Sequence, residues 1–127
     1  MKSKPKKVTV PESIDGCFEV LKKDSKLVEM YENHKQPKKC KSPLDEIPTG
    51  LHFGLGTWIR NNWGLWSKKG SLYTYFKGLG VWHADDMSGI ILVSFGRHLR
   101  NQSLRVPEQV ECYKKFWGDN IPKDAFK

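Results

Sequence analysis

The residues best suited to bind an anionic ligand fall into two short blocks, 52–62 and 83–86. Together the blocks supply imidazole, guanidinium, amide and carboxylate groups, on His52, Arg60, Asn62, His83, Asp85 and Asp86. An arginine with aromatic neighbours can hold a phosphate while a ring stacks on a base, so one hypothesis is a nucleotide-like pocket or enzyme centred on these groups. The alternative is structural. Arg60 would then form an ion pair with Asp85 or Asp86 and tie the two blocks together.

Asn62 and His52 each allow two interpretations as well. The helical angle of Asn62 places it inside an apolar arc, where an unpaired buried amide costs about 1–3 kcal/mol. Asn62 therefore either points into a polar pocket or lies at a helix end and bonds the carbonyls left free there. His52 shares a side with Gly56 and Ile59, and it is either a hydrogen-bonded core residue or a ligand-binding group.

A second group of residues suits recognition of a partner protein. The chain contains five tryptophans in 127 residues. Tryptophan, tyrosine and arginine supply most of the binding energy at protein interfaces. The residues expected to form such a surface are Trp63, Trp66, Tyr73 and Trp82. We therefore expect a non-enzymatic binding protein, with an acidic protein surface as its partner.

The positive charge of the chain supports an alternative, nucleic-acid binding. The formal net charge is +8, and a basic chain is attracted to phosphate backbones as well as to acidic proteins. The residues that would contact nucleic acid are Lys2, Lys4, Lys6, Lys7, Lys38, Lys39, Lys41, Arg97 and Arg100. The alternative is that these lysines are simply solvent-exposed and bind nothing, because most of them fall in an N-terminal arm and a proline-containing linker.

Other kinds of chemistry find little support in the sequence. The histidines and acids show no HExxH or comparable spacing, so neither a metal site nor a cofactor is expected. Asp85 and Asp86 are adjacent and lie about 100° apart on a helix, so interaction with the helix dipole explains them better than paired acid–base chemistry. Cys17 and Cys112 lie on apolar helical stripes, and nothing orients a base toward Cys40. No catalytic residue is assigned.

The three cysteines also bear on the compartment. An odd number without CxxC pairing is typical of free thiols in a reducing environment. No apolar run approaches the roughly 18 residues of a membrane helix, and the lysine-rich start lacks the apolar segment of a secretory signal. We expect a cytoplasmic protein with no membrane contact.

The N-terminal half predicts two short helices. Thr9 and Glu12 have the spacing of a capping box and Pro11 suits a first turn, so a helix is expected to begin near Thr9. Its apolar residues recur at helical spacing, at Ile14, Cys17, Phe18 and Leu21. A second helix is expected over 24–33, and residues 34–46 are expected to form a solvated loop.

The tryptophan-rich segment 51–63 predicts a third helix. Its apolar side chains fall on one broad arc, formed by Leu51, Leu55, Trp58, Ile59 and Trp63. Gly64 sits where a left-handed helix cap would lie. A further short helix is expected to end before Gly80.

The remaining segments predict a central helix and a terminal one. Residues 87–99 are apolar nearly all round and follow an acidic first turn, which favours a buried helix, although Ile90–Phe95 alone would also suit a buried strand. Pro107 opens a C-terminal helix over 107–117, which Gly118 ends. The candidate ligand site requires the segments 51–63 and 86–99 to pack together.

Two blocks of sequence resemble a family of short bacterial and phage proteins, the domain of unknown function DUF6794. They are His52-Phe-Gly-Leu-Gly-Thr-Trp-Ile-Arg-Asn-Asn-Trp-Gly-Leu-Trp66 and His83-Ala-Asp-Asp-Met-Ser88, followed by Ile90-Ile-Leu92. A helix start at Val10-Pro-Glu-Ser-Ile14 also fits. The resemblance covers about residues 9–100 and departs at Ala84, where the family has proline. It implies a shared fold but transfers no activity.

These observations predict an all-α fold, a compact single-domain bundle of about five or six helices. We expect a flexible basic arm over 1–8 and one helical domain over 9–127, with the family-like core at about 9–100. The leading hypothesis is a binding protein, for example an accessory factor of the immunity or anti-defence type in a bacterium or phage. Nucleic-acid binding and a small anionic-ligand pocket remain the alternatives.

Overall fold

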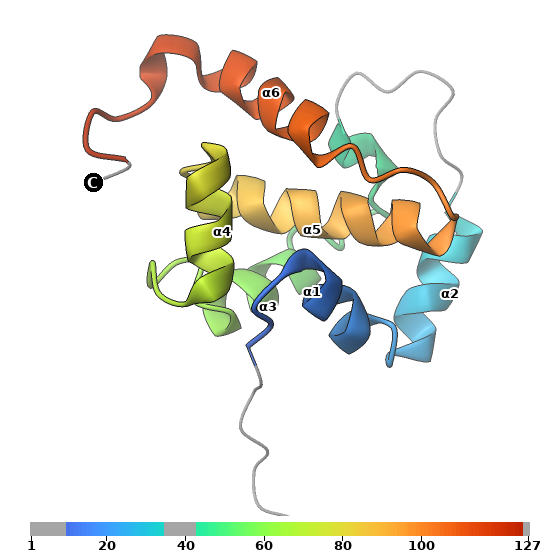
Figure 1. Ribbon diagram of the computed structural model, residues 1–127. Helices are drawn as coiled ribbons and strands as arrows, with labels where there is room; N and C mark the ends of the chain where they lie inside the picture. The colour runs from blue at the N-terminus through green and yellow to red at the C-terminus, as the bar shows by residue number, and fades with distance from the viewer. Residues whose placement is uncertain (1–9, 35–42, 126–127) are drawn as a thin grey trace, which may run out of the picture.

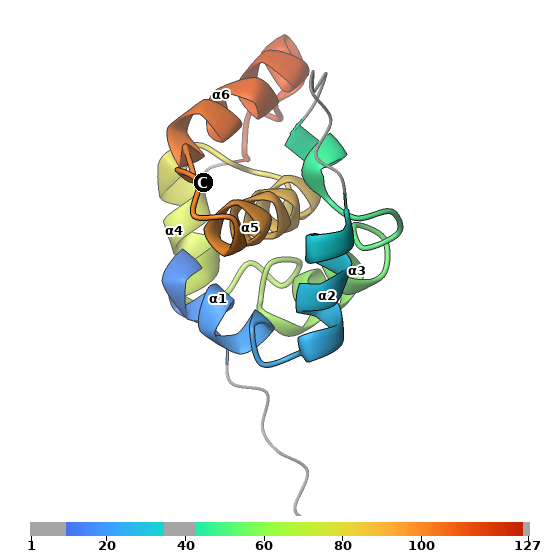
Figure 2. The same ribbon diagram turned by 90° about the vertical axis from the view of Figure 1, so that its right-hand side faces the viewer.

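One helix, α5 (Ala84–Leu99), runs through the middle of the molecule and the other helices surround it (Figures 1 and 2). The computed structural model describes residues 10–34 and 43–125. Within these residues the other elements are α1 (Ile14–Leu21), α2 (Ser25–Asn33), η1 (Pro43–Glu46), α3 (Leu55–Asn62), α4 (Ser71–Leu79), α6 (Val106–Trp117) and η2 (Gly118–Asn120). The predicted all-α bundle is confirmed, and the run Ile90–Phe95 is helical.

The sequence of α5 explains its central position. Every residue from Asp86 to Gly96 is buried, and the apolar ones are fully enclosed by neighbouring helices. The acidic first turn and the basic last turn both stabilise the helix dipole. His83 caps the helix, because its Nδ1 accepts a hydrogen bond from the backbone N–H of Asp85 at 3.0 Å. A helix that is apolar on all sides can only be stable when other helices cover it.

The start of α1 differs from the prediction. Ser13 is the capping residue, and its hydroxyl accepts a hydrogen bond from the N–H of Gly16 at 3.1 Å. The expected capping box began at Thr9, which lies outside the described residues. The reason is that Ser13 offers an equally good cap just before the first apolar residue, Ile14, and Pro11 is buried before the helix begins. The helix α2, capped by Asp24, matches its prediction.

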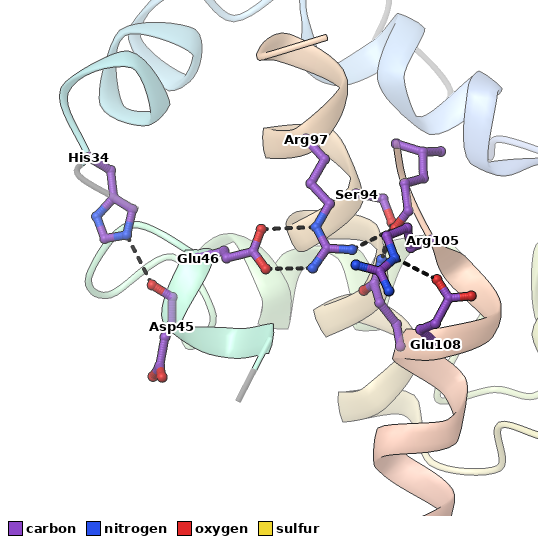
Figure 3. A network of polar contacts seen from close by, with 9 residues as sticks. His34, Asp45, Glu46, Ser94, Arg97, Arg105 and Glu108 are labelled. Carbon is purple, nitrogen blue, oxygen red and sulfur yellow. Dashed lines mark hydrogen bonds and ion pairs between the residues drawn. The ribbon is translucent and has the colours of Figure 1, made fainter. Parts of the chain in front are cut away.

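The predicted loop 34–46 contains an ordered anchor at its end. Residues 43–46 form the 3-10 helix η1, and Glu46 is buried. Both of its carboxylate oxygens accept hydrogen bonds from Arg97 of α5, at 2.9 and 2.6 Å (Figure 3). Arg97 also donates to the carbonyl of Leu104 at 2.7 Å. A single arginine therefore fixes both η1 and the connection that leads to α6.

Two glycines permit close approaches that a side chain would prevent. Gly64 has a positive φ of 81°, and a Cβ atom there would lie 2.3 Å from the carbonyl oxygen of Lys69, which confirms its predicted role in ending α3. At Gly96 a Cβ atom would lie 2.9 Å from the ring of Tyr31. The absent side chain lets Tyr31 reach the carbonyl of Leu92, to which its hydroxyl donates a hydrogen bond at 2.8 Å.

Candidate functional site

The two sequence blocks of the candidate ligand site do meet, because α3 packs against α5. Arg60 lies at the centre of the contact. Its Nε is 3.1 Å from a carboxylate oxygen of Asp85, one terminal nitrogen donates to the Ser88 hydroxyl at 2.7 Å, and the other donates to the Thr57 hydroxyl at 2.8 Å. The side chain is only 7% exposed. Of the two interpretations of Arg60, the structure shows the structural tie.

Gly56 explains how the Arg60 guanidinium fits between the helices. A Cβ atom on Gly56 would lie 3.0 Å from a terminal nitrogen of Arg60 and 3.7 Å from the side chain of Leu92. Glycine within a helix costs about 1 kcal/mol relative to alanine. At this position that cost is offset by the space it leaves for the guanidinium.

The two histidines both lie near this ion pair. The Nδ1 of His83 is 3.9 Å from the second carboxylate oxygen of Asp85. His52 is partly buried, and its backbone carbonyl accepts a long hydrogen bond of 3.5 Å from a terminal nitrogen of Arg60. Burial lowers the pKa of His52, the positive charge of Arg60 lowers it further, and the charge of Asp85 acts in the opposite direction. His52 is consequently neutral near pH 7 and adds no positive charge to hold an anion.

Two further residues of the predicted ligand set turn away from this contact. The side-chain amide of Asn62 donates a hydrogen bond to the carbonyl of Trp58 within α3 at 2.8 Å. This matches the interpretation in which Asn62 bonds a carbonyl near the helix end. Asp86 is only 8% exposed and accepts a hydrogen bond from the indole N–H of Trp117 at 2.7 Å. The predicted site thus brings together His52, Arg60, His83 and Asp85 but not the other two.

Asp86 makes the stability of the fold depend on pH. Burial raises the pKa of Asp86, and the Trp117 hydrogen bond and the nearby His83 only partly compensate. A carboxyl group whose pKa is raised on folding favours the folded state most when it is protonated, so this contribution is lost as the pH rises through the folded pKa. We expect Asp86→Asn to have a higher urea midpoint than the wild type at neutral pH, with the difference vanishing below the ordinary aspartate pKa of about 4.

The variant Trp117→Phe provides the matched control for this prediction. It removes the indole donor but keeps an aromatic ring, so the ionised Asp86 loses its partner and stability should fall more steeply with rising pH. Urea unfolding of the three proteins between acid and neutral pH gives the comparison. A wild type that is more stable than Asp86→Asn at neutral pH would contradict the prediction.

The residues predicted to bind a partner divide between core and surface. The structure places Trp63 and Tyr73 in the core, at 0% and 7% exposure. Both lie on the inner side of their helices, where apolar packing outweighs any use as an interface. Trp66 is 50% exposed, and Trp82 is partly exposed.

A continuous aromatic surface forms around Trp66 and Trp82. His83 is the central ring, with its centroid 5.5 Å from that of Trp66, 5.1 Å from that of Trp82 and 5.7 Å from that of Trp117, on which it stacks. Trp82 and Trp117 are 4.8 Å apart, and Phe116 lies 5.3 Å from Trp117. We call Trp66, Trp82, His83, Phe116 and Trp117 the aromatic surface.

The sequence prediction missed Phe116 and Trp117. Both fall in the predicted C-terminal helix 107–117, and nothing in the sequence showed that the end of this helix lies beside Trp82. In the structure Phe116 is 74% exposed. The only signal in the sequence was the presence of two adjacent large aromatic residues at the end of this helix.

Positive charge borders the aromatic surface. Lys68 and Lys69 come two and three residues after Trp66, and Lys115 precedes Phe116; all three are exposed. The exposed acidic residue nearest in sequence to a ring of the aromatic surface is Asp119, two residues after Trp117. The acids at the start of α5 are already engaged, with Arg60 and with Trp117.

The residues predicted to contact nucleic acid are only partly described. Lys2, Lys4, Lys6, Lys7, Lys38, Lys39 and Lys41 lie outside the described residues. Arg97 is bound to Glu46 and Leu104, and Arg100 donates to the carbonyl of Tyr31 at 3.5 Å. Arg97 is thus held by an ion pair and Arg100 by one long hydrogen bond, so both side chains already have partners within the fold.

Residues 10–34 and 43–125 contain no group of three or more histidines, cysteines or acids that could hold a metal ion. None of the helices in these ranges combines the length and the hydropathy that a membrane span needs. Burial raises the pKa of Cys17 to about 12, as suits a core thiol. Cys112, expected on an apolar stripe, is instead exposed, because α6 turns that side toward solvent.

Comparison with known proteins gives one match. A family model described as Domain of unknown function (DUF6794) matches residues 10–99. No curated protein and no solved structure matches the chain.

Proposed function

The chain belongs to the DUF6794 family, whose function is unknown, and we propose from its geometry that it is a non-enzymatic binding protein whose aromatic surface recognises an acidic protein. A cytoplasmic location is part of this proposal. It is supported by the free thiols of Cys17 and Cys112.

The observation that carries the proposal is the continuity of the aromatic surface. Three segments far apart in sequence contribute its rings: the residues after α3, the residues before α5 and the end of α6. Trp66 and Phe116 are half or more exposed, although burying such rings would stabilise the protein. Exposed contiguous aromatic groups with a polar rim are typical of interaction sites.

The charges around the surface indicate which partner it would accept. The exposed cations Lys68, Lys69 and Lys115 favour a partner with acidic groups around an apolar centre. A small anionic ligand at Arg60 is less well supported, because the guanidinium already forms an ion pair with Asp85 and both of its terminal nitrogens donate hydrogen bonds within the protein. Aromatic rings beside lysines can also bind single-stranded nucleic acid. The experiment below distinguishes binding of an acidic peptide from binding of nucleic acid.

A displayed peptide library selected on the wild-type protein tests the proposal. We expect the recovered peptides to be rich in Asp and Glu and to contain an apolar residue. Trp66→Ala and Phe116→Ala should each weaken their binding about thirtyfold, the effect of losing an interface hot spot of about 2 kcal/mol. Fluorescence anisotropy with a purified labelled peptide gives the dissociation constants.

Phe53→Ala is the matched control. Phe53 is 79% exposed, similar to Phe116, but its ring contacts only His52 among the ring pairs of the described residues. Peptide binding should therefore be unchanged in Phe53→Ala. Selected peptides without acidic residues, or equal losses in all three variants, would overturn the proposal. Binding of labelled oligo-dT that depends on Trp66 and falls steeply with salt would favour nucleic acid instead.

A further inference from the structure

The helix α6 forms the outermost layer of the molecule, lying along α5 after the connection 100–105 (Figures 1 and 2). Of its twelve residues only Gln109 and Val110 are buried. Its main packing contacts are with α5 and with η2, which directly follows it. Removing α6 would leave the contacts among the other helices around α5 in place.

Val110 of α6 packs in the hydrophobic core, but the polar groups between α6 and α5 are incompletely hydrogen-bonded. The side-chain amide of Gln109 donates to the Ser94 hydroxyl at 3.0 Å and to the carbonyl of Leu104 at 2.9 Å. Trp117 binds Asp86, as described above. However, the amide oxygen of Gln109 and the hydroxyl of Tyr113 are buried without a hydrogen-bond partner among the described residues. Such unpaired atoms weaken the docking.

The face of α5 under this helix is nevertheless shaped for it. A Cβ atom at Gly89 would lie 2.7 Å from the Tyr113 hydroxyl, so only glycine lets this ring sit against α5. The hydroxyl of Ser94 and the carboxylate of Asp86 lie where Gln109 and Trp117 can reach them. The fit between this face of α5 and α6 depends only on the side chains of α6. The α6 of a second copy of the chain would therefore make the same contacts.

The connection 100–105 holds two residues in a left-handed backbone conformation. Asn101 has φ 57° and Arg105 has φ 51°. Asparagine tolerates this region, but arginine does so at a cost, and Arg105 makes no side-chain cap for α6. An extended connection would relieve that strain. Short strained connections favour exchange of the following element between chains.

We propose that α6 is exchangeable, so that the face of α5 formed by Asp86, Gly89 and Ser94 also accepts the α6 of a second copy of this chain. Two copies would then exchange helices reciprocally and retain every contact between α5 and α6. The strain at Arg105 would be released in both chains. Because association costs entropy, the exchanged dimer should form only as the protein concentration rises.

Two substitutions of Arg105 test the proposal at a single position. Proline cannot adopt φ 51°, so Arg105→Pro disfavours the closed chain, whereas Arg105→Gly removes the strain and favours it. Both lose the same ion pair with Glu108, which is exposed on both sides and contributes little. Light scattering after gel filtration at millimolar protein should show the most dimer for Arg105→Pro, less for the wild type and least for Arg105→Gly. The association constant for dimerisation of Arg105→Gly should be about a hundredfold below that of the wild type, because a strain worth about tenfold is released in each of the two chains.

Exchange itself is measured by mixing isotopically heavy and light wild-type protein at high concentration. Mixed dimers should appear by native mass spectrometry. Circular dichroism checks that Arg105→Pro remains helical, and if it does not, the comparison of wild type with Arg105→Gly decides. The proposal is overturned if the wild type stays monomeric at millimolar concentration, or if Arg105→Gly dimerises as well as the wild type.

Discussion

Replacing Arg97 with alanine is expected to lower the free energy of unfolding by about 3–5 kcal/mol, the cost of breaking a buried ion pair by removing one partner. The Arg97 side chain is 16% exposed and that of Glu46 only 4%. Without the guanidinium, the Glu46 carboxylate would remain buried without its ionic partner, and the Leu104 carbonyl would lose a hydrogen bond. Urea unfolding followed by circular dichroism measures the change.

Arg100→Ala is the control for this prediction. Arg100 occupies the next turn of the same helix end, but its hydrogen bond to Tyr31 is long, at 3.5 Å. We expect its loss to cost about 1 kcal/mol or less. The double variant in which Met replaces Arg97 and Leu replaces Glu46 should recover much of the lost stability, since apolar pairs often substitute for buried ion pairs. Similar losses for the Arg97 and Arg100 variants would contradict the assigned role.

Trp63→Ala is expected to lower the free energy of unfolding by about 3–5 kcal/mol, the usual cost of truncating a buried aromatic residue. Trp63 has no exposed surface, and its ring contacts that of Trp58 at 5.8 Å. Trp66→Ala, three residues later, removes a ring that is half exposed and should cost about 1 kcal/mol or less. Thermal and urea unfolding of the two variants gives the comparison.

Binding of the selected acidic peptide should show the opposite order for these two tryptophans. At a temperature where both variants are folded, Trp63→Ala should bind as the wild type does, and Trp66→Ala should have lost most of its affinity. Equal loss of binding in both variants would mean that peptide binding reports only the loss of folded protein, and not a direct contact with Trp66. The pair thus separates the residues that hold the aromatic surface in place from those that contact a partner.

The helices could be predicted where apolar spacing and caps agreed. The segment 87–99 is apolar on nearly all sides and has acidic and basic ends, so both signals indicated the central helix that the structure shows. The start of the first helix was predicted too early because Thr9 and Ser13 both precede the same apolar stripe, and only the folded chain shows that Ser13 caps it. The 3-10 helix at 43–46 has no periodic pattern, and its position depends on Arg97, more than fifty residues later.

The candidate site was predictable only where opposite charges had to meet. An ion pair of Arg60 with Asp85 or Asp86 was one prediction once the two helices were expected to pack together, and the structure shows that Asp85 is the partner. The sequence did not predict which tryptophans are exposed. Trp63 and Trp66 are only three residues apart, and Trp63 is buried while Trp66 is half exposed because the chain leaves α3 between them. The contribution of Trp117 depends on the path of α6 over α5, which no local pattern encodes.

The family match ends at residue 99, which is also the last residue of α5. Two of the five rings of the aromatic surface, Phe116 and Trp117, therefore come from beyond the shared region. The region matched by the family model supplies the other three rings of the aromatic surface, Trp66, Trp82 and His83. If the aromatic surface binds a partner as proposed, a change in the sequence after residue 99 would alter two of its rings and leave the helices around α5 in place.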